Sequence, residues 1–176
     1  MNIEKLIADA TMHIGQNYFQ LPIDGLENPI YRERVYCYEL YHQLRVRWPE
    51  DTDYELSGEV DKSGHPLIRG NHLDQVKPDL LVHIPGDMGG NHTIIEVKPI
   101  TASRAGIAKD LTTLTAFIRF ADYRNAFYLL YGDRDITRVL ELTEELQGQD
   151  REDKIDLAPI QIWWHRDVGV PATRVR

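Results

Sequence analysis

The sequence predicts an α/β fold in which helices flank a central mixed sheet. Residues 77–99 have the pattern of two strands joined by a turn, and a helical pattern up to about residue 121 leads into an apolar strand at 126–131. A tight turn pairs strands antiparallel, whereas a strand–helix–strand connection of this length suits a parallel crossover. With 176 residues, we expect one domain over residues 1–176 with a substantial core.

Two helices and a loop are predicted at the start of the chain. Apolar residues on one face predict a short helix over 3–16, and Pro and Gly predict a loop over 17–29. A longer helix is expected from residue 30 or 31 to about 47, where Pro49 ends it. Its buried stripe is expected to contain Tyr36, Leu40 and Leu44.

Strands are expected on both sides of the turn-rich segment that follows. Residues 54–60 alternate loosely and predict a strand, and residues 66–69 are expected to return as a short one. Within the hairpin, the apolar runs 80–82 and 93–95 form the two strands, and the Pro-, Gly- and Asn-rich segment between them forms the turn.

Charged residues stand where the hairpin strands begin and end. Asp79 opens the first strand, and Glu96, Val97 and Lys98 close the second. Because side chains alternate along a strand, Glu96 and Lys98 point to one face and Val97 points to the other. The hairpin therefore offers one acid from its first strand, and one acid with a lysine from its second.

These groups suit the binding of a divalent cation. Two adjacent carboxylates are hard oxygen ligands of the kind that Mg²⁺ prefers, and the ion would keep several waters. Without a cation the like charges repel, and one carboxylate tends to take up a proton. Lys98 beside them could orient a metal-bound water, hold its hydroxide form or neutralise charge on a phosphate.

After the hairpin, the pattern continues with alternating helices and strands. Thr101 or Ser103 can cap the helix that reaches about residue 121. The continuously apolar strand 126–131 should be buried on both faces. A helix over 137–147, an acidic linker and a last strand over 160–164 follow, and we expect the tail, residues 174–176, to be disordered.

The Pro78-Asp79 and Glu96-Val97-Lys98 segments resemble the motif of the PD-(D/E)XK phosphodiesterases, the restriction-endonuclease-like superfamily. The predicted element order over about residues 31–131 is similar to its αβββαβ core, with an N-terminal helix before it and a helix and strand appended after it. The resemblance implies a metal-dependent nuclease in which Asp79 and Glu96 hold Mg²⁺ or Mn²⁺. The Val97 carbonyl would be a further ligand, and Lys98 would assist the attacking water.

The resemblance also suggests two further acids for the metal site. Superfamily members often place a glutamate from the helix before the sheet near the metal, and Glu39 is similar in position; a pair with Arg32 or Arg45 is an equal alternative. Glu59 lies on the strand expected beside that of Asp79. It could be another ligand or an ordinary charge at a strand end.

The net charge and the composition limit which partners and which cellular location we expect. A net charge of −8 is unfavourable for a nucleic-acid enzyme, so it weakens the expectation of a DNA substrate without refuting it. A single cysteine, Cys37, excludes an intramolecular disulfide and suits a reducing cytosol, so we expect a cytoplasmic protein. No apolar run approaches the ~20 residues that span a bilayer, so no membrane partner is expected. A homodimer or a protein partner could supply recognition.

Two rival functions fit the same sequence. One is a non-catalytic member of the nuclease fold, a binding or assembly subunit of a DNA-processing complex, whose motif would be expected to be damaged. The other is an unrelated α/β enzyme in which the motif is accidental, and there the carboxylates of Asp79 and Glu96 would lie far apart.

Overall fold

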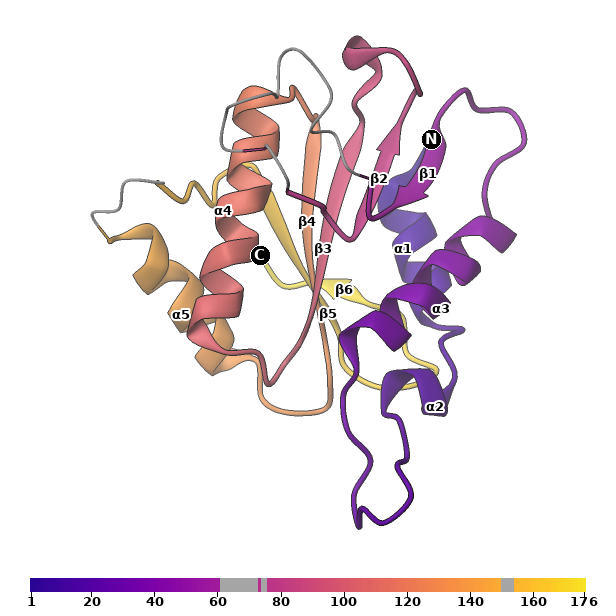
Figure 1. The fold of residues 1–176 in the computed structure, drawn as a ribbon, viewed down its shortest axis with the longest axis vertical. Coiled ribbons are helices and arrows are strands. Elements are labelled where there is room, and N and C mark those ends of the chain that lie inside the picture. The colour runs from indigo at the N-terminus through magenta and orange to yellow at the C-terminus, as the bar shows by residue number, and fades with distance from the viewer. Residues whose placement is uncertain (61–72, 74–75, 150–153) are drawn as a thin grey trace.

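The computed structural model describes residues 1–60, 73, 76–149 and 154–176. These residues form a six-stranded mixed sheet with five α-helices, and the strand order in the sheet follows the sequence, β1 to β6 (Figure 1). The elements are α1 (Ile3–Thr11), α2 (Gln16–Phe19), α3 (Glu33–Val46), β1 (Glu55–Gly58), β2 (Leu80–His83), β3 (Thr93–Pro99), α4 (Arg104–Phe120), β4 (Asn125–Tyr131), α5 (Thr137–Gln147), β5 (Ile160–His165) and β6 (Thr173–Arg174).

The pairing of the strands divides the sheet into an antiparallel half and a parallel half. Strands β1, β2 and β3 pair antiparallel in succession, β3 pairs parallel with β4, and β4 pairs parallel with β5. The predicted hairpin and the predicted parallel crossover through α4 are therefore both confirmed. The α/β class with a mixed sheet is confirmed with them.

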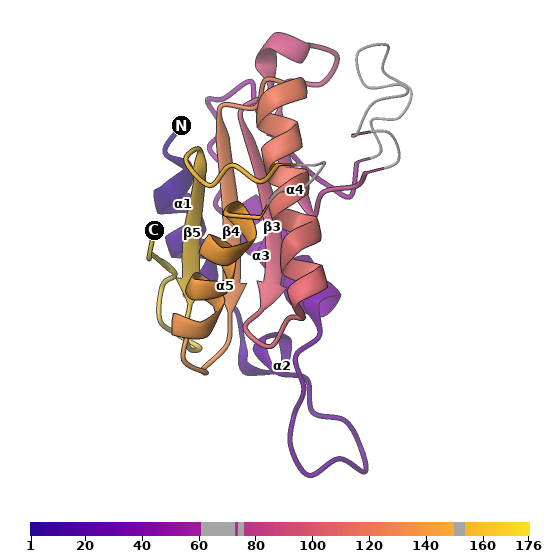
Figure 2. The ribbon, with the colours of Figure 1, turned by 90° about the vertical axis from the view of Figure 1, so that its left-hand side faces the viewer.

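Helices cover both faces of the sheet. Helices α4 and α5 pack on one face, against sheet residues such as Leu81, Ile94 and Leu130. Helices α1, α2 and α3 pack on the other, against Leu80 and Val97 among others. Figures 1 and 2 show the two helical layers on opposite sides of the strands. Val97 thus faces the α3 layer, as the alternation of the strand predicted.

Two local predictions were wrong. The first helix ends at Thr11 instead of residue 16, and the short helix α2 occupies part of the predicted loop, with Gly15 as its N-cap. The C-terminal tail is not disordered, because Thr173–Arg174 forms β6 against β5. The Val175 N–H also donates to the Ile162 carbonyl at 2.9 Å, so backbone hydrogen bonds hold the tail.

The remaining elements lie close to their predicted positions. Ser103 caps α4 by accepting a hydrogen bond from the Gly106 N–H at 3.2 Å, and β4 is buried along almost its whole length. The strand predicted at 66–69 lies outside the described residues. Across the described part of the chain, no helix combines the length and the apolar character needed to cross a membrane.

Candidate active site

The end of the β2–β3 hairpin brings two acids together. In the antiparallel register Leu80 pairs with Ile95, so the next position places Asp79, just before β2, opposite Glu96 in β3. Asp79 Oδ2 accepts a hydrogen bond from the Val97 N–H at 2.8 Å. The Asp79 carboxylate also lies close enough to Glu96 for its charge to raise the pKa of the Glu96 carboxyl group.

Lys98 shares the strand face of Glu96 and is held between two further acids. Its Nζ lies 2.8 Å from Oε1 of Glu33 in the first turn of α3, and 3.4 Å from Oδ2 of Asp110 in α4. Burial lowers the pKa of Lys98, but the hydrogen bond that Lys98 donates to Glu33 and the charges of Asp110 and Glu33 outweigh it and raise the pKa above its ordinary value. The ammonium group is therefore positive at every physiological pH.

Sequence reasoning missed Glu33 and Asp110. Glu33 carried no signal, because an acid in the first turn of a helix is common. Asp110 did carry one. It lies three residues after Ile107 and four before Leu114, so it is an acid on the apolar face of α4, and its side chain is only 4% exposed. A charge on a buried face requires a partner, and Lys98 is that partner.

Burial and the charges of neighbouring acids raise the pKa values of Asp79, Glu96 and Asp110. Burial raises the pKa of Glu96 well above its ordinary value, and the charges of Asp79 and Asp110 raise it further. Burial also raises the pKa of Asp79, against the hydrogen bond from the Val97 N–H. Burial raises the pKa of Asp110 to about 7, although Lys98 pulls it downward. Glu33, Asp79, Glu96, Lys98 and Asp110 are called the acidic cluster below.

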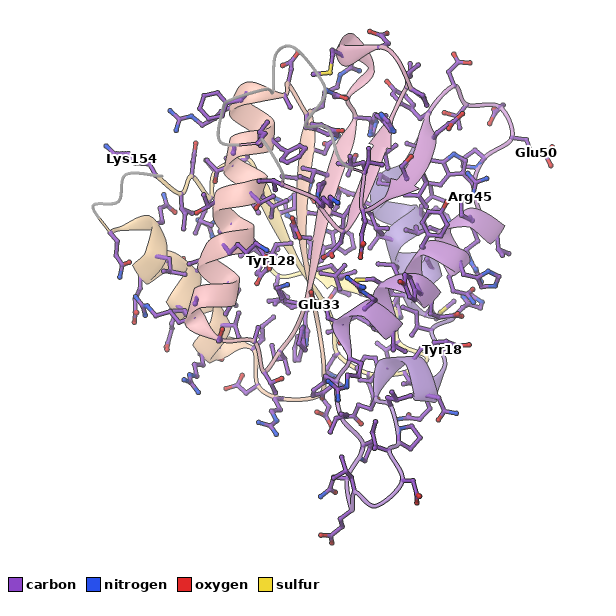
Figure 3. All side chains as sticks on the ribbon, viewed as in Figure 1. Tyr18, Glu33, Arg45, Glu50, Tyr128 and Lys154 are labelled. Carbon is purple, nitrogen blue, oxygen red and sulfur yellow. The ribbon has the colours of Figure 1, made fainter. Side chains whose placement is uncertain are left out.

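Tyr128 on β4 forms the wall of the acidic cluster. It pairs in register with Glu96, and among the described residues its buried hydroxyl has no hydrogen-bond partner. Burial raises the pKa of this hydroxyl well above its ordinary value, and the charges of Asp110 and Glu96 add to the effect. Figure 3 labels Glu33 and Tyr128, which contribute to the cluster from α3 and β4. A neutral Tyr128 hydroxyl can donate one hydrogen bond toward the carboxylates.

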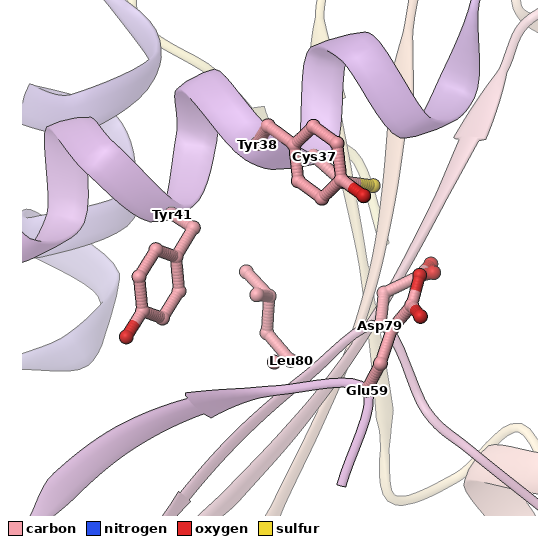
Figure 4. A pocket seen from close by; sticks show the side chains of 7 residues that line it. Cys37, Tyr38, Tyr41, Glu59, Asp79 and Leu80 are labelled. Atoms are coloured by element: carbon pink, nitrogen blue, oxygen red, sulfur yellow. The ribbon is translucent and has the colours of Figure 1, made fainter.

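A cavity of about 380 Å³ adjoins the acidic cluster. Asp79 belongs to both, because its side chain points from the hairpin toward the cavity (Figure 4). We call this cavity the tyrosine cavity; its lining residues are Cys37, Tyr38, Tyr41, Gly58, Glu59, Asp79 and Leu80. The hairpin end is therefore open to a ligand from the side of α3 and β1.

The structure places Glu59 and Glu39 differently. Glu59 follows β1, lines the tyrosine cavity beside Asp79, and forms an ion pair with Arg34 at 3.3 Å. Its backbone N–H donates to the Asp79 carbonyl at 3.1 Å. Glu39 instead accepts a hydrogen bond from Gln43 Nε2 at 2.6 Å, within α3. It lines neither the cavity nor the acidic cluster, and its partner is an amide instead of the arginines considered above.

The donor set limits which metal the site could hold. Across residues 1–60, 73, 76–149 and 154–176, no group of three or more His, Cys, Asp or Glu side chains is arranged to hold a metal ion. Asp79 and Glu96 form a set of two carboxylates, and Mg²⁺ is commonly bound by one or two carboxylates together with waters and substrate phosphates. Burial is the main cause of their raised pKa values, and the charges of neighbouring acids add to it; a divalent cation would favour the ionised form of both carboxyl groups. The residues therefore fit Mg²⁺ or Mn²⁺ with few protein ligands.

No protein-family model and no curated protein sequence matches this chain.

Proposed function

We propose that this protein is a metal-dependent nuclease that hydrolyses phosphodiester bonds in nucleic acid, with DNA as the expected polymer. The observation that carries the proposal is the meeting of Asp79, Glu96 and Lys98 at the end of one hairpin, with the pKa values of both acids raised. Supporting it, the order α3, β1, β2, β3, α4, β4 is similar to the αβββαβ core of the PD-(D/E)XK superfamily.

In this proposal Asp79 and Glu96 hold Mg²⁺ or Mn²⁺, and the Val97 carbonyl is a further ligand. When bound, the ion supplies a Lewis acid for a phosphoryl oxygen and lowers the pKa of a bound water. The protein keeps its ligands in place: the Val97 N–H fixes the Asp79 carboxylate, and the strand register fixes Glu96 opposite it. Carboxyl groups bind a cation in their ionised form, so the raised pKa values of both acids make metal binding release protons.

Lys98 acts as a fixed positive charge in this mechanism. Its raised pKa means that it cannot accept a proton from water near neutral pH, so it does not serve as a general base. An ammonium group has three N–H donors; one donates to Glu33 Oε1 at 2.8 Å, and Asp110 Oδ2 lies 3.4 Å away as an ion-pair partner. A remaining donor can bind a water or a phosphate oxygen, and the two acids hold the side chain in place for it.

The alternative, a non-catalytic binding or assembly subunit of the same fold, also has an observation in its favour. Four acids surround one lysine in the acidic cluster, and the whole chain carries a net charge of −8. Such a surface repels phosphate unless a cation is bound. The two hypotheses predict different results in one measurement: the nuclease cleaves nucleic acid in the presence of a divalent metal, and the binding subunit does not.

A cleavage panel tests the proposal. Single- and double-stranded DNA, RNA and branched DNA are incubated with the protein in Mg²⁺, in Mn²⁺ and in chelator. We expect cleavage with metal and none in chelator, and we expect Asp79→Asn to abolish it. Asp24→Asn is the matched control, because Asp24 is an exposed acid in the loop between α2 and α3. Absence of cleavage from every substrate would favour the binding subunit.

Calorimetric titration of Mn²⁺ tests the ligand assignment independently of activity. The wild type should bind one ion and release protons, since the acids must ionise first. Asp79→Ala should lose this binding, and Asp24→Asn should keep it. Equal binding by Asp79→Ala and wild type would remove Asp79 from the metal site.

A further inference from the structure

The tyrosine cavity has the shape and chemistry of a small-molecule pocket. Its volume of about 380 Å³ falls within the range of roughly 300–1,000 Å³ found for ligand sites. One part of its wall is aromatic and apolar, from Tyr38, Tyr41 and Leu80, and another part carries the carboxylates of Glu59 and Asp79 (Figure 4). The metal proposal uses only Asp79 from this wall.

Two tyrosines on α3 form the aromatic wall. Tyr38 and Tyr41 are three residues apart, so they are neighbours on the helix surface. The Tyr38 side chain is 63% exposed, and among the described residues its hydroxyl makes no hydrogen bond. The Tyr41 hydroxyl lies 3.5 Å from the Leu56 carbonyl, and its side chain packs against the core while it lines the cavity. The exposed Tyr38 ring is therefore available to stack on a flat ligand.

Gly58 lines the cavity without a side chain, so the space beside it stays open. A Cβ atom built at this position would lie 3.6 Å from the Asp79 carbonyl oxygen, 3.7 Å from Leu80 and 4.0 Å from Tyr41. These are ordinary van der Waals distances, so a side chain can be placed there without displacing its neighbours. The rest of that side chain would then occupy space in the cavity.

The position and the polarity of the cavity indicate which class of ligand it binds. In the proposed nuclease, Asp79 would hold the metal and its phosphate at one end of the cavity, so a group covalently attached to that phosphate would lie toward the aromatic wall. In nucleic acid this group is the nucleoside, and a nucleobase has a π face that stacks on tyrosine. The Glu59 carboxylate can accept hydrogen bonds from a base amino group, as acidic side chains do from cytosine. A base that is paired within a duplex cannot enter such a cavity.

On the basis of the proposed nuclease function, we propose that the tyrosine cavity binds one unpaired nucleobase next to the cleaved phosphate, so that the substrate is single-stranded nucleic acid or a single-stranded segment of a branched one. Tyr38 stacks on the base, Tyr41 borders it, and Glu59 accepts from its amino group. Duplexes without unpaired bases are poor substrates.

Fluorescence of 2-aminopurine in a short single-stranded oligonucleotide tests the cavity without requiring cleavage. The base is quenched when it stacks; Mn²⁺ is present because the acids repel phosphate without a cation, and backbone linkages that resist hydrolysis prevent cleavage. Stacking on one aromatic side chain is worth about 1–3 kcal/mol, so Tyr38→Ala should weaken binding roughly 5- to 150-fold. Tyr38→Phe should bind as wild type does, because it keeps the ring. Gly58→Val should weaken binding by filling the cavity, with Tyr38 intact.

Tyr18→Ala is the matched control, since Tyr18 is an exposed tyrosine of α2 that does not line the cavity. It should leave both quenching and affinity unchanged. Thermal melting of all variants checks that they are folded. Equal affinity of wild type, Tyr38→Ala and Gly58→Val would overturn the proposed cavity ligand.

Cleavage assays on the same variants separate this inference from the nuclease proposal. We expect Tyr38→Ala to lower kcat/KM on single strands by the factor found for binding. Metal-dependent cleavage that is indifferent to Tyr38 and Gly58 would overturn the cavity ligand and leave the nuclease standing. Quenching that depends on Tyr38, without cleavage of any substrate, would support the cavity as a base-binding site and overturn the nuclease.

Discussion

The acidic cluster and a second buried polar group use opposite means to keep ionisable side chains inside the protein. The second group, which we call the aromatic cluster, contains Phe19, Tyr36, Tyr131 and His165. Tyr36 stacks on Tyr131 with ring centroids 3.9 Å apart, and its hydroxyl lies 2.8 Å from His165 Nδ1. Phe19 packs edge-on against the His165 ring at 5.0 Å.

In the aromatic cluster, burial removes charge. It lowers the pKa of His165 to about 4, although the Asp167 backbone and charge act in the opposite direction, so the imidazole is neutral near pH 7. Its Nδ1 pairs with the Tyr36 hydroxyl, whereas its Nε2 and the Tyr131 hydroxyl have no hydrogen-bond partner among the described residues. With His165 neutral, the aromatic cluster holds no excess of one charge for a ligand to relieve.

In the acidic cluster, several acids lie close together around one lysine in a partly buried space. Asp79, Glu96 and Asp110 all have raised pKa values because each lies among other acids in a partly dry space. The difference teaches that burial of an ionisable group does not by itself indicate a functional site. An excess of one charge does, because a ligand of the opposite charge would relieve it.

The largest expected effect is the loss of cleavage in Lys98→Ala. Removing one preorganised electrostatic group typically costs about 10²–10³-fold in rate, and we expect a loss of this size in single-turnover cleavage with Mg²⁺. Lys98→Arg should recover little, because guanidinium lacks the compact ammonium geometry that Glu33 and Asp110 hold. Mn²⁺ binding should persist in Lys98→Ala, since the lysine is not a ligand.

A double variant separates catalysis from folding in this prediction. Lys98→Ala alone leaves Asp110 buried without its cation, which destabilises the protein. Lys98→Ala with Asp110→Asn removes the unpaired acid and should recover thermal stability, while cleavage stays low. Full cleavage by either variant would remove Lys98 from the site.

The next largest effect is expected from a variant that disrupts the aromatic cluster. Tyr36→Phe removes the hydroxyl that pairs with His165, and leaving a buried polar atom without a partner costs about 1–3 kcal/mol of unfolding free energy. Urea denaturation measures this loss. Cleavage per folded molecule should equal that of wild type, because the cluster contacts no proposed ligand. Tyr18→Phe, at an exposed tyrosine, is the control and should change neither property.

The pH dependence of stability should sharpen the comparison. A carboxyl group with a raised folded-state pKa binds its proton more tightly in the folded chain than in the unfolded chain, where the pKa of Asp is about 3.9. Its contribution to stability is therefore complete below about pH 4 and is lost as the pH rises toward the folded value of about 7 for Asp110. His165 acts with the opposite sign, because its folded pKa is about 4 and its stabilisation is lost as the pH falls from about 6.5.

We therefore expect the acidic cluster to lower the unfolding free energy of the metal-free protein by on the order of 1–2 kcal/mol between pH 5 and pH 8. This value is smaller than the full pKa shift of the acids implies, because Lys98 offsets part of it. Denaturation at a series of pH values measures it. Asp110→Asn should flatten this loss, and saturating Mg²⁺ should do the same by replacing protons. An unchanged slope in Asp110→Asn would contradict the raised pKa of Asp110, with Asp24→Asn as the reference.

The smallest effect is expected at Glu39. Its side chain is bound to Gln43 on its own helix, outside the acidic cluster. Glu39→Gln should leave metal binding and cleavage within twofold of wild type, measured beside Asp24→Asn. Loss of Mn²⁺ binding in Glu39→Gln would instead restore Glu39 to the metal site.

Local patterns in the sequence predicted much of this molecule. The predicted helix over 137–147 coincides with α5, and the alternation at Glu96, Val97 and Lys98 predicted which side chains share a face. The hairpin also predicted that Asp79 and Glu96 would stand on adjacent strands. These results depend on backbone periodicity and on turn residues, which act over a few positions and can be read directly from the chain.

Tertiary packing decided the rest. The N-terminus of α3 and the middle of α4 approach the end of β3, and only this approach brings Glu33 and Asp110 to Lys98 from segments far apart in sequence. The same packing of α3 beside β1 created the tyrosine cavity, and free hydrogen-bonding groups along β5 drew the tail into β6. The sequence alone determined which residues carry charge and which strand face they occupy. Their ionisation states were decided by the fold, because burial and the distances between charges exist only once the layers have packed.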